Sequence, residues 1–308
     1  MAQQRDVRMQ GLFRRRPSGT TTLVGLIGSD IRGSLSLRLH NEAYAASDMD
    51  WLYLPLTVPA NPPTRLKEAV HGLRALGFAG ANVTMPHKVA VLPYLDDLTE
   101  KAQKIGAVNT IRVEKDGRLI GGNTDGAGFL ADLGEQDVDC QRQPALVLGA
   151  GGAARAVAYT LAEHGCPEIT IVNRTESKAR QLVHELALLF PDLELAAHPW
   201  ERRVEAARDN SLLINCTNVG MNGVCTPSGS PSPWPSDAPL CQTQRIIDLV
   251  YTPRTTPLLQ RAMKEGLQTI SGVGMLVHQA ALSFAWWAES SPPIDAMHAA
   301  ISSPANLR

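Results

Sequence analysis

The sequence of 308 residues lacks the features that define several classes of protein. Its five cysteines form no C-x-x-C pair and its eight histidines show neither HxH nor HxxxH spacing, so neither a disulfide scaffold nor a metal site is predicted. The longest apolar stretch, Val273 to Ala288, contains His278 and Gln279. It is shorter than the ~20 residues of a membrane-spanning helix. These absences favour a cytoplasmic protein in a reducing compartment.

The charges are nearly balanced, with 29 Lys and Arg against 30 Asp and Glu. A net charge of −1 provides no overall field to attract nucleic acid or an anionic membrane, although a local cationic pocket for a small anion is compatible with it. With 44% hydrophobic and 19% charged residues, the chain is neither disordered, collagen-like nor a coiled coil. We expect a small-molecule ligand, no nucleic-acid or membrane partner, and a monomer or homodimer.

Residues 1–19 form a basic leader. This segment contains one acidic residue, Asp6, and five arginines: Arg5, Arg8, Arg14, Arg15 and Arg16. An Arg-rich, acid-poor leader can target a protein to an organelle. This one lacks the serines and the amphipathic period of a transit peptide, so a flexible arm ahead of the first strand is the favoured interpretation.

From Thr22 onward, short β-rich runs alternate with amphipathic stretches, which predicts an α/β fold with mostly parallel sheets. The strands predicted are Leu23–Ile27, Trp51–Leu56, Gly80–Thr84, Val108–Val113, Ala145–Leu148, Glu168–Val172, Ser211–Asn215, Ile246–Val250 and Leu267–Ile270. The helices predicted are Arg38–Ala46, Thr64–Leu76, Gly126–Leu133, Ala153–His164, Thr175–Leu189, Pro257–Glu265, Val273–Ala288 and a terminal helix after Pro293. Residues 225–240, with five prolines and four serines, are predicted to form a surface loop.

A glycine-rich turn is predicted between the strand at 145–148 and the helix at 153–164. It reads Gly149, Ala150, Gly151, Gly152, Ala153 and Ala154. This is a G-x-G-x-x-A pattern, in which Gly149 permits the tight turn, Gly151 lets the backbone approach a pyrophosphate, and Ala154 keeps helix and strand close. The positive end of the helix then faces the phosphates. The flanking strands favour a dinucleotide site over an ordinary turn.

The end of the next strand indicates which dinucleotide is bound. NAD sites usually place an acid there to hold the ribose 2′-hydroxyl. This chain has Asn173, Arg174 and Thr175, with Lys178 one turn later. These groups suit a 2′-phosphate and therefore predict NADP, although solvated cations at a helix start are the alternative. Glu176 has the discordant charge, but it can serve the first turn without facing the ligand.

Polar residues gather in four segments of the first half. These are Ser34–Ser36, Asn82–Lys88, Gly106–Thr110 and Gly121–Gly126. Most lie near the end of a predicted strand, where open α/β sheets bind ligands, and together they offer hydroxyls, amides, an ammonium and a carboxylate for a polyol. Each also has an ordinary explanation: Ser34, Ser36 and Asp125 as helix caps, Asn109 as a turn residue, and Lys88 as a solvated cation.

At these residues the sequence resembles the shikimate dehydrogenase family, which includes the quinate/shikimate dehydrogenases. The resemblance rests on Ser34-x-Ser36 followed by His40-Asn41, on NVTMPHK (82–88), GAVNT (106–110), GGNTDG (121–126), GAGGAAR (149–155), VNRT (172–175) and GVGMLVHQAA (272–281). The motifs stand in the family's order from Leu23 to about Trp287.

The resemblance implies a role for each matching residue. Ser34 and Ser36 would hold the substrate carboxylate, and Lys88 and Asp125 would be the catalytic pair at the oxidised hydroxyl. The other expected ligands of the substrate are Thr84, Asn109 and Gln279, at its hydroxyls, and Tyr251, near the carboxylate. Those expected for NADP are the turn at 149–154, Asn173, Arg174, Thr175 and Lys178, with Gly272 and Met275 beside the nicotinamide. Because His87 neighbours Lys88 on an extended segment, its side chain is expected to point away, which makes it the weaker candidate for the base.

The implied architecture is a substrate domain (20–125 and 273–308) and a Rossmann-type NADP domain (126–272), with the site in the cleft between them. The implied reaction is the interconversion of shikimate and 3-dehydroshikimate in chorismate and aromatic amino-acid biosynthesis. Gly33 and Leu37 replace the family's usual His and Pro, so an altered substrate preference is expected. A quinate/shikimate or aminoshikimate-type dehydrogenase, or a non-catalytic metabolite-binding paralogue, are the alternatives.

Overall fold

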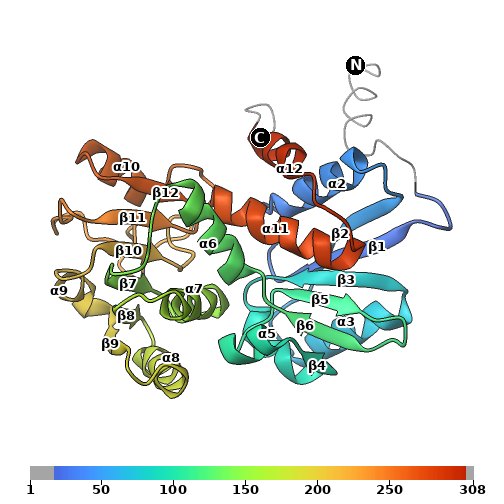
Figure 1. The fold of residues 1–308 in the computed structure, drawn as a ribbon, viewed down its shortest axis with the longest axis horizontal. Coiled ribbons are helices and arrows are strands. Elements are labelled where there is room, and N and C mark those ends of the chain that lie inside the picture. The colour runs from blue at the N-terminus through green and yellow to red at the C-terminus, as the bar shows by residue number, and fades with distance from the viewer. Residues whose placement is uncertain (1–16, 303–308) are drawn as a thin grey trace.

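The computed structural model of the protein describes residues 17–302. Two six-stranded sheets lie side by side within this range, and helices pack around both (Figure 1). The predicted α/β class is therefore confirmed, whereas the arginines of the basic leader lie outside the described residues. Across 17–302, every helix is too short or too polar to cross a bilayer.

The first sheet has the strand order β2-β1-β3-β5-β6-β4. Its strands are β1 (Thr22–Gly28), β2 (Trp51–Thr57), β3 (Phe78–Val83), β4 (Asp97–Leu98), β5 (Thr110–Val113) and β6 (Leu119–Gly122). Neighbours run parallel, except that β5 is antiparallel to both β3 and β6. The sequence did not predict β4 or β6, because β4 has two residues and β6 ends in two glycines, which weaken a strand pattern.

The second sheet is parallel throughout, in the order β12-β11-β10-β7-β8-β9. Its strands are β7 (Ala145–Leu148), β8 (Glu168–Asn173), β9 (Glu194–Pro199), β10 (Leu212–Asn215), β11 (Arg245–Asp248) and β12 (Thr269–Ser271). This is the doubly wound order, which reverses between β7 and β10 and places a ligand crevice at their carboxyl ends. The sequence did not predict strand β9, because it is an edge strand with no fully buried residue.

The α-helices of residues 17–302 include every predicted helix, and the predicted ends agree with the observed ones to within two residues. They are α2 (Ser36–Ala46), α3 (Thr64–Ala75), α4 (His87–Ala90), α5 (Glu100–Ile105), α6 (Asp125–Glu135), α7 (Gly152–Glu163), α8 (Glu176–Leu189), α9 (Arg203–Ala206), α10 (Pro257–Lys264), α11 (Val273–Ala288) and α12 (Ile294–Ser302). Short helices α4, α5 and α9 were not predicted. Local signals explain the ends: at α10, Thr256 Oγ1 accepts the amide of Leu259 at 3.3 Å and Pro257 opens the first turn.

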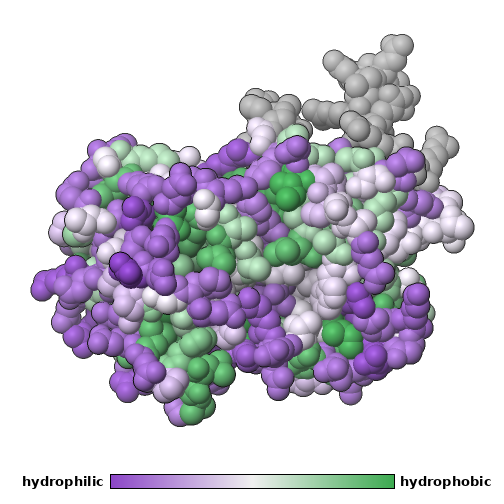
Figure 2. Space-filling view, in the orientation of Figure 1, coloured by the Kyte–Doolittle hydropathy of each residue, from purple (hydrophilic) through white to green (hydrophobic). Residues whose placement is uncertain are grey.

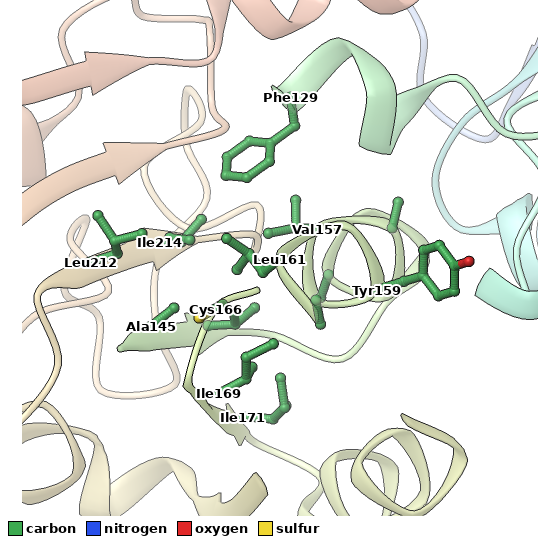
Figure 3. Packing of buried hydrophobic residues seen from close by; sticks show 14 of the residues in the cluster. Phe129, Ala145, Val157, Tyr159, Leu161, Cys166, Ile169, Ile171, Leu212 and Ile214 are labelled. Atoms are coloured by element: carbon green, nitrogen blue, oxygen red, sulfur yellow. The ribbon is translucent and has the colours of Figure 1, made fainter. Parts of the chain in front are cut away.

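The core of the second sheet is a layer of aliphatic side chains beneath α7. All four residues of β7 are buried, as expected for a parallel strand covered on both faces. Figure 3 shows Val157 and Leu161 of α7 above Ile169 of β8 and beside Ile214 of β10, with Phe129 of α6 above them. Helix α7 therefore has a fixed position over β7, and its N-terminus lies at the ligand-binding edge.

The C-terminal helices return to the first sheet, as predicted. Val277, Ala280 and Phe284 of α11 are fully buried in one cluster with Val24 of β1 and Leu39 of α2. Helix α12 packs on α2 and α11, while α3 covers the other face of this sheet (Figure 1). The predicted domain boundaries at 125/126 and 272/273 stay a prediction.

The face of the molecule seen in Figure 2 is largely hydrophilic. Apolar side chains show at its lower edge, where α8 lies, and Leu188 and Leu189 of that helix are exposed. These leucines extend the apolar side of α8 beyond the core.

Candidate active site

A cavity of about 400 Å³ lies between the two sheets. The ends of β1 and β3, the loops after β10 and β11, and the first turns of α11 form its walls. All eight residues predicted to bind substrate or to act in catalysis line it: Ser34, Ser36, Thr84, Lys88, Asn109, Asp125, Tyr251 and Gln279. Segments far apart in the sequence thus meet at one cavity.

Lys88 and Asp125 form an ion pair in this cavity. The distance from Lys88 Nζ to Asp125 Oδ2 is 2.6 Å, and the two side chains are 16% and 4% exposed. Lys88 lies on α4, and Asp125 is the first residue of α6. The alternative role of Asp125 as N-cap is wrong, because Thr124 occupies the cap position. A carboxylate in the first turn is still stabilised by the helix dipole.

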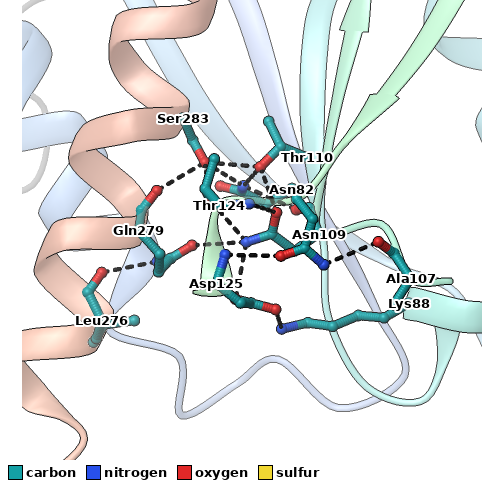
Figure 4. Close-up of polar contacts among 11 residues, drawn as sticks. Asn82, Lys88, Ala107, Asn109, Thr110, Thr124, Asp125, Leu276, Gln279 and Ser283 are labelled. Carbon is teal, nitrogen blue, oxygen red and sulfur yellow. Dashed lines mark hydrogen bonds and ion pairs between the residues drawn. The ribbon is translucent and has the colours of Figure 1, made fainter. Parts of the chain in front are cut away.

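Asn109 fixes the other oxygen of this carboxylate (Figure 4). Its Nδ2 lies 2.9 Å from Asp125 Oδ1 and 3.2 Å from Gln279 Oε1, and its Oδ1 accepts the Thr124 amide at 2.8 Å. Gln279 in turn donates from Nε2 to the Leu276 carbonyl at 2.8 Å. Both oxygens of Asp125 are therefore engaged, which holds the carboxylate in one orientation toward Lys88.

A buried polar layer that the sequence did not predict adjoins this site and is drawn above Asp125 in Figure 4. Asn82 Nδ2 lies 3.1 Å from both Thr110 Oγ1 and Ser283 Oγ, and Asn82 Oδ1 accepts the Tyr53 hydroxyl at 2.7 Å. The Asn82 amide also donates to the Asn109 carbonyl at 3.0 Å. Asn82 and Thr110 stand in the motifs at 82–88 and 106–110, but only the fold shows that they support Asn109.

The two serines line the cavity from the start of α2, and we call this part of it the serine end. Ser36 begins α2 and is 8% exposed, and Ser34 Oγ accepts its amide at 3.3 Å. Leu35 holds the N-cap position, so neither serine is the cap residue. Burial raises the pKa of the Tyr251 hydroxyl, and the Ser34 side chain beside it opposes that shift. The three hydroxyls form one polar group at this end.

The loop ahead of the serines contributes three lining residues that the sequence did not single out as ligands. Asp30 and Arg32 form an exposed ion pair, with Arg32 Nε 3.0 Å from Asp30 Oδ1. Gly33 follows, and a Cβ added there would meet no atom within 4 Å. In the sequence, their position beside Ser34 is the only feature that could have marked these residues as part of the site. The absent side chain at Gly33 therefore leaves open space beside Ser34.

The far wall comes from the second sheet and includes Cys216, whose thiol pKa is raised by burial. Buried Asp248, at the end of β11, holds this wall together. Its Oδ1 accepts Asn215 Nδ2 at 2.8 Å and its Oδ2 accepts the Thr256 hydroxyl at 2.6 Å. Burial raises the Asp248 pKa to about 6. These bonds join the ends of β10 and β11, where the lining loops begin.

The predicted glycine turn fits a dinucleotide pyrophosphate. Gly149 has a φ of 113°, in the left-handed region that favours glycine. A Cβ at Gly151 would meet no atom within 4 Å, so a ligand can approach the backbone there, and Ala154 is fully buried against the core. Gly151 is the N-cap residue of α7 and makes no side-chain cap bond, which leaves first-turn amides for an anion.

The same turn lies against Lys88, the predicted catalytic lysine. A Cβ added to Gly152 would lie 2.5 Å from Lys88 Cβ and 3.0 Å from its Cδ. Of the residues predicted to bind the cofactor, Ala153, Gly272 and Met275 also line the cavity. Gly149–Gly152 and Ala154 instead follow the end of β7, and Asn173, Arg174, Thr175 and Lys178 lie at the end of β8 and the start of α8.

The charges after β8 suit a phosphate. Arg174 and Lys178 are exposed, and neither forms an ion pair with another residue in 17–302. Glu176 pairs with Arg180, with Arg180 Nη2 2.6 Å from Glu176 Oε1, so its charge is directed along the helix. Asn173 Nδ2 donates to the Thr175 carbonyl at 2.8 Å, which holds the turn.

Two histidines of the family motifs lie outside the cavity. His87 is 2% exposed and its Nε2 is 2.8 Å from the Val58 carbonyl, so it lies outside the cavity that Lys88 lines. The extended segment predicted for the two residues is wrong, because both lie on helix α4. His40 is fully buried and stacks on Tyr53 at 4.3 Å. Its neighbour Asn41 accepts the Tyr53 amide at 2.8 Å and so ties α2 to β2. These motif residues support the fold.

Three family models match the chain. Residues 26–111 match the shikimate dehydrogenase substrate binding domain, residues 132–220 match shikimate / quinate 5-dehydrogenase, and residues 272–301 match the shikimate 5′-dehydrogenase C-terminal domain. These three segments contain all but two of the predicted site residues, Asp125 and Tyr251.

Whole-chain comparisons agree with these matches. The chain is 45% identical over 284 residues to a shikimate dehydrogenase (NADP(+)) of Salinibacter ruber, which covers 92% of this chain and 97% of that protein. It resembles a crystal structure of shikimate dehydrogenase in complex with NADP+, with a TM-score of 0.82, 35% identity and coverage of 93% and 96%. For the shikimate 5-dehydrogenase of Thermus thermophilus in complex with NADP(H) and shikimate, the TM-score is 0.75, with 37% identity and coverage of 91% and 98%.

Proposed function

Because the chain belongs to the shikimate dehydrogenase family, we propose that it catalyses the reversible NADP-dependent interconversion of shikimate and 3-dehydroshikimate. The observation that carries this proposal is the 2.6 Å contact between Lys88 Nζ and Asp125 Oδ2, inside a cavity that also contains Ser34 and Ser36. A cation–carboxylate pair and a set of hydroxyls in one cavity suit a substrate with one reacting alcohol and one carboxylate.

In this proposal Lys88 is the acid and base. Bound NADP supplies the hydride acceptor, and the protein supplies orientation and a proton carrier. Lys88 Nζ takes the proton of the reacting hydroxyl during oxidation and returns it during reduction. Asp125 positions Nζ through Oδ2 and accepts a hydrogen bond from the reacting or the adjacent hydroxyl, while Asn109 holds Oδ1. A positioned group of this kind contributes about 10²–10⁴-fold to the rate.

The substrate is oriented by hydroxyls and amides. Ser34 and Ser36 donate to the carboxylate, with Tyr251 beside them. The ring hydroxyls are assigned to Thr84, Asn109 and Gln279. A substrate that lacked these oxygens would leave buried polar groups unpaired, so the site discriminates against deoxygenated analogues.

The cofactor site is assigned to the second sheet. The turn at 149–154 holds the pyrophosphate, and Asn173, Arg174, Thr175 and Lys178 hold the 2′-phosphate. Gly272 and Met275 flank the nicotinamide, and both line the cavity that contains Lys88. The open backbone at Gly151 suits the pyrophosphate of either dinucleotide, and the exposed cations after β8, unpaired within residues 17–302, support NADP over NAD.

The proposal divides the chain into a substrate domain (20–125 and 273–308) and an NADP domain (126–272). It places the reaction in chorismate and aromatic amino-acid biosynthesis, in the cytoplasm, by a monomer or homodimer. All five cysteines are free thiols, which is consistent with a reducing compartment.

An absorbance assay of nicotinamide reduction tests the activity directly, with shikimate and quinate each combined with NADP and NAD. Shikimate with NADP is expected to give the largest kcat/KM. No turnover with any pair at high enzyme concentration would contradict the proposal and favour a non-catalytic metabolite-binding protein.

A second candidate, a quinate/shikimate or aminoshikimate-type dehydrogenase, is favoured by one observation. Gly33 leaves space where the family usually has His, and this space lies at the carboxylate end of the cavity. Quinate turnover comparable to shikimate turnover, reduced by Gly33→His, would support that candidate.

A further inference from the structure

Three side chains with metal-binding groups meet where α6, α11 and α12 come together. Glu135 ends α6, His278 lies on α11 and His298 lies on α12. One ligand atom of each lies within 4.8 Å of the other two. None of these residues lines the cavity between the sheets. Figure 1 shows α12 lying against α11, with α6 crossing nearby.

The His278 ring occupies an unusual position for an imidazole. Its side chain is 10% exposed, and its Nε2 is buried without a hydrogen-bond partner. Nevertheless Glu135 Oε2 is only 3.1 Å from that nitrogen. Two ligands of one tetrahedral zinc ion, with bonds of about 2.0–2.2 Å, lie roughly 3.4 Å apart. The observed separation thus resembles that of two ligands of one ion.

The third ligand can reach the same point. The rings of His278 and His298 lie edge to face, with centroids 6.1 Å apart and planes at 78°. The 4.8 Å limit on the ligand atoms exceeds the roughly 3.4 Å of a closed tetrahedral site, so a small contraction is required. Glu135 Oε2 is already 3.1 Å from His278 Nε2, so the contraction concerns His298, on the partly exposed helix α12.

The local charge favours a cation. Asp132, one turn before Glu135, is buried and accepts the Met275 amide at 3.0 Å. Burial raises the Asp132 pKa to about 6, and both His278 and Glu135 lie close enough to alter it. Within residues 17–302, no lysine or arginine forms an ion pair with Glu135. Among residues 17–302, the imidazole of His278 is therefore the one group beside both of these carboxylates that can carry a positive charge.

We propose that Glu135, His278 and His298 bind one divalent transition-metal ion of the zinc type. Two imidazoles and a carboxylate are a ligand set that zinc accepts, with a water in the fourth position, whereas calcium and magnesium prefer oxygen ligands alone. The ion joins three helices and fastens α12 to the body of the protein. The sequence predicted no metal site because the three ligands are widely separated in the chain, with no local spacing to reveal them.

The test is a zinc titration of the untagged full-length chain after treatment with a chelator. Calorimetry is expected to show one saturable Zn²⁺ site per chain, and Zn²⁺ but not Mg²⁺ is expected to raise the melting temperature. Glu135→Gln and His298→Asn should each weaken the affinity by about tenfold or more, because each removes one of three ligands. These positions are not fully buried, so both variants should fold, which circular dichroism checks.

Matched controls separate this site from other zinc-binding groups. His184→Asn changes an exposed histidine on α8, and Cys225→Ser with Cys241→Ser removes the exposed thiols. Both controls should bind Zn²⁺ as the parent does. No saturable Zn²⁺ binding by the parent, equal affinity in Glu135→Gln and His298→Asn, or loss of binding in a control would overturn the proposal. The assay is independent of turnover, so it stands apart from the proposed reaction.

Discussion

Lys88 Nζ lies 2.6 Å from Asp125 Oδ2, although 37 positions separate the two residues in the chain. One stands after β3 and the other at the start of α6, so the pair depends on the folded first sheet. We expect Lys88→Ala to lower kcat by about 10²–10⁴-fold with little change in KM for NADP. Steady-state kinetics at saturating shikimate measures this. Lys115→Ala, at an exposed position between β5 and β6, is the control, and a near-parental kcat in Lys88→Ala would remove Lys88 from the chemistry.

Asp125→Asn separates charge from shape at the same site. The amide keeps the size of the side chain but cannot form an ion pair with Lys88 or accept hydrogen bonds at both positions. We expect a lower kcat, by about 10²-fold, with a small effect on KM for NADP. A parental kcat would show that Asp125 is not part of the catalytic pair.

Ser36→Ala should act on substrate binding alone. Loss of a hydroxyl donor to a carboxylate costs roughly 1.5–3 kcal/mol, which corresponds to about a 10- to 100-fold increase in KM for shikimate. KM for NADP should stay near the parental value, because Ser36 lies on α2, at the end of the cavity near Tyr251. Ser177→Ala, at an exposed position on α8, is a matched control. Equal increases in both KM values would indicate that Ser36 only stabilises the start of its helix.

Arg174→Ala should change the preference between cofactors. An arginine that binds a phosphate contributes about 1.5–3 kcal/mol, so KM for NADP should rise by roughly 10- to 100-fold while KM for NAD changes little. Arg202→Ala, which removes another exposed arginine, should alter neither. The ratio of kcat/KM for NADP to that for NAD is the decisive quantity. An unchanged ratio would place the 2′-phosphate elsewhere.

His40 gives the folded state a predictable response to acid. Burial lowers its pKa to about 3, below the ordinary value near 6.5, so only the unfolded chain gains this proton between these pH values. The free energy of unfolding therefore falls on acidification by up to about 1.4 kcal/mol per pH unit from His40 alone. In His40→Phe, urea unfolding at pH 7 and pH 5 should show a difference smaller by about 2 kcal/mol.

Two buried carboxyls oppose this trend in both proteins. Asp132 and Asp248 have pKa values raised to about 6, so each stabilises the fold at low pH and loses that contribution as the pH rises through 6. The comparison of His40→Phe with the parent cancels their effect. The same pH dependence in both would show that His40 accepts a proton without unfolding.

Local patterns predicted most of the helices and of the parallel strands, because each carries its own signal. The cap at Thr256 and the glycine turn at 149–152 can be read from a few neighbouring residues. Edge strands could not be predicted from neighbouring residues in the sequence. In β9 no residue is fully buried and in β4 only two residues pair, so tertiary hydrogen bonds decide their conformation.

The candidate site was predictable only where a motif marks it. Lys88 and Asp125 stand in conspicuous motifs, and the structure brings them together. Ser283 and Tyr53 support the site through Asn82, but they come from α11 and β2 and stand in ordinary apolar surroundings in the sequence. Their contribution depends on which elements pack together, and no local pattern contains that information.

Gly152 and Lys88 occupy adjoining space, since a single methyl group on the glycine would overlap the stem of the lysine. In the proposed mechanism, the residue that admits the nucleotide and the residue that moves the proton are therefore constrained by one steric boundary. Any bulk gained at position 152 would displace the amine from Asp125 as well as crowd the pyrophosphate. Evolution or engineering of coenzyme choice has to proceed at the ribose end, after β8, where a change of side chain leaves the reacting amine undisturbed.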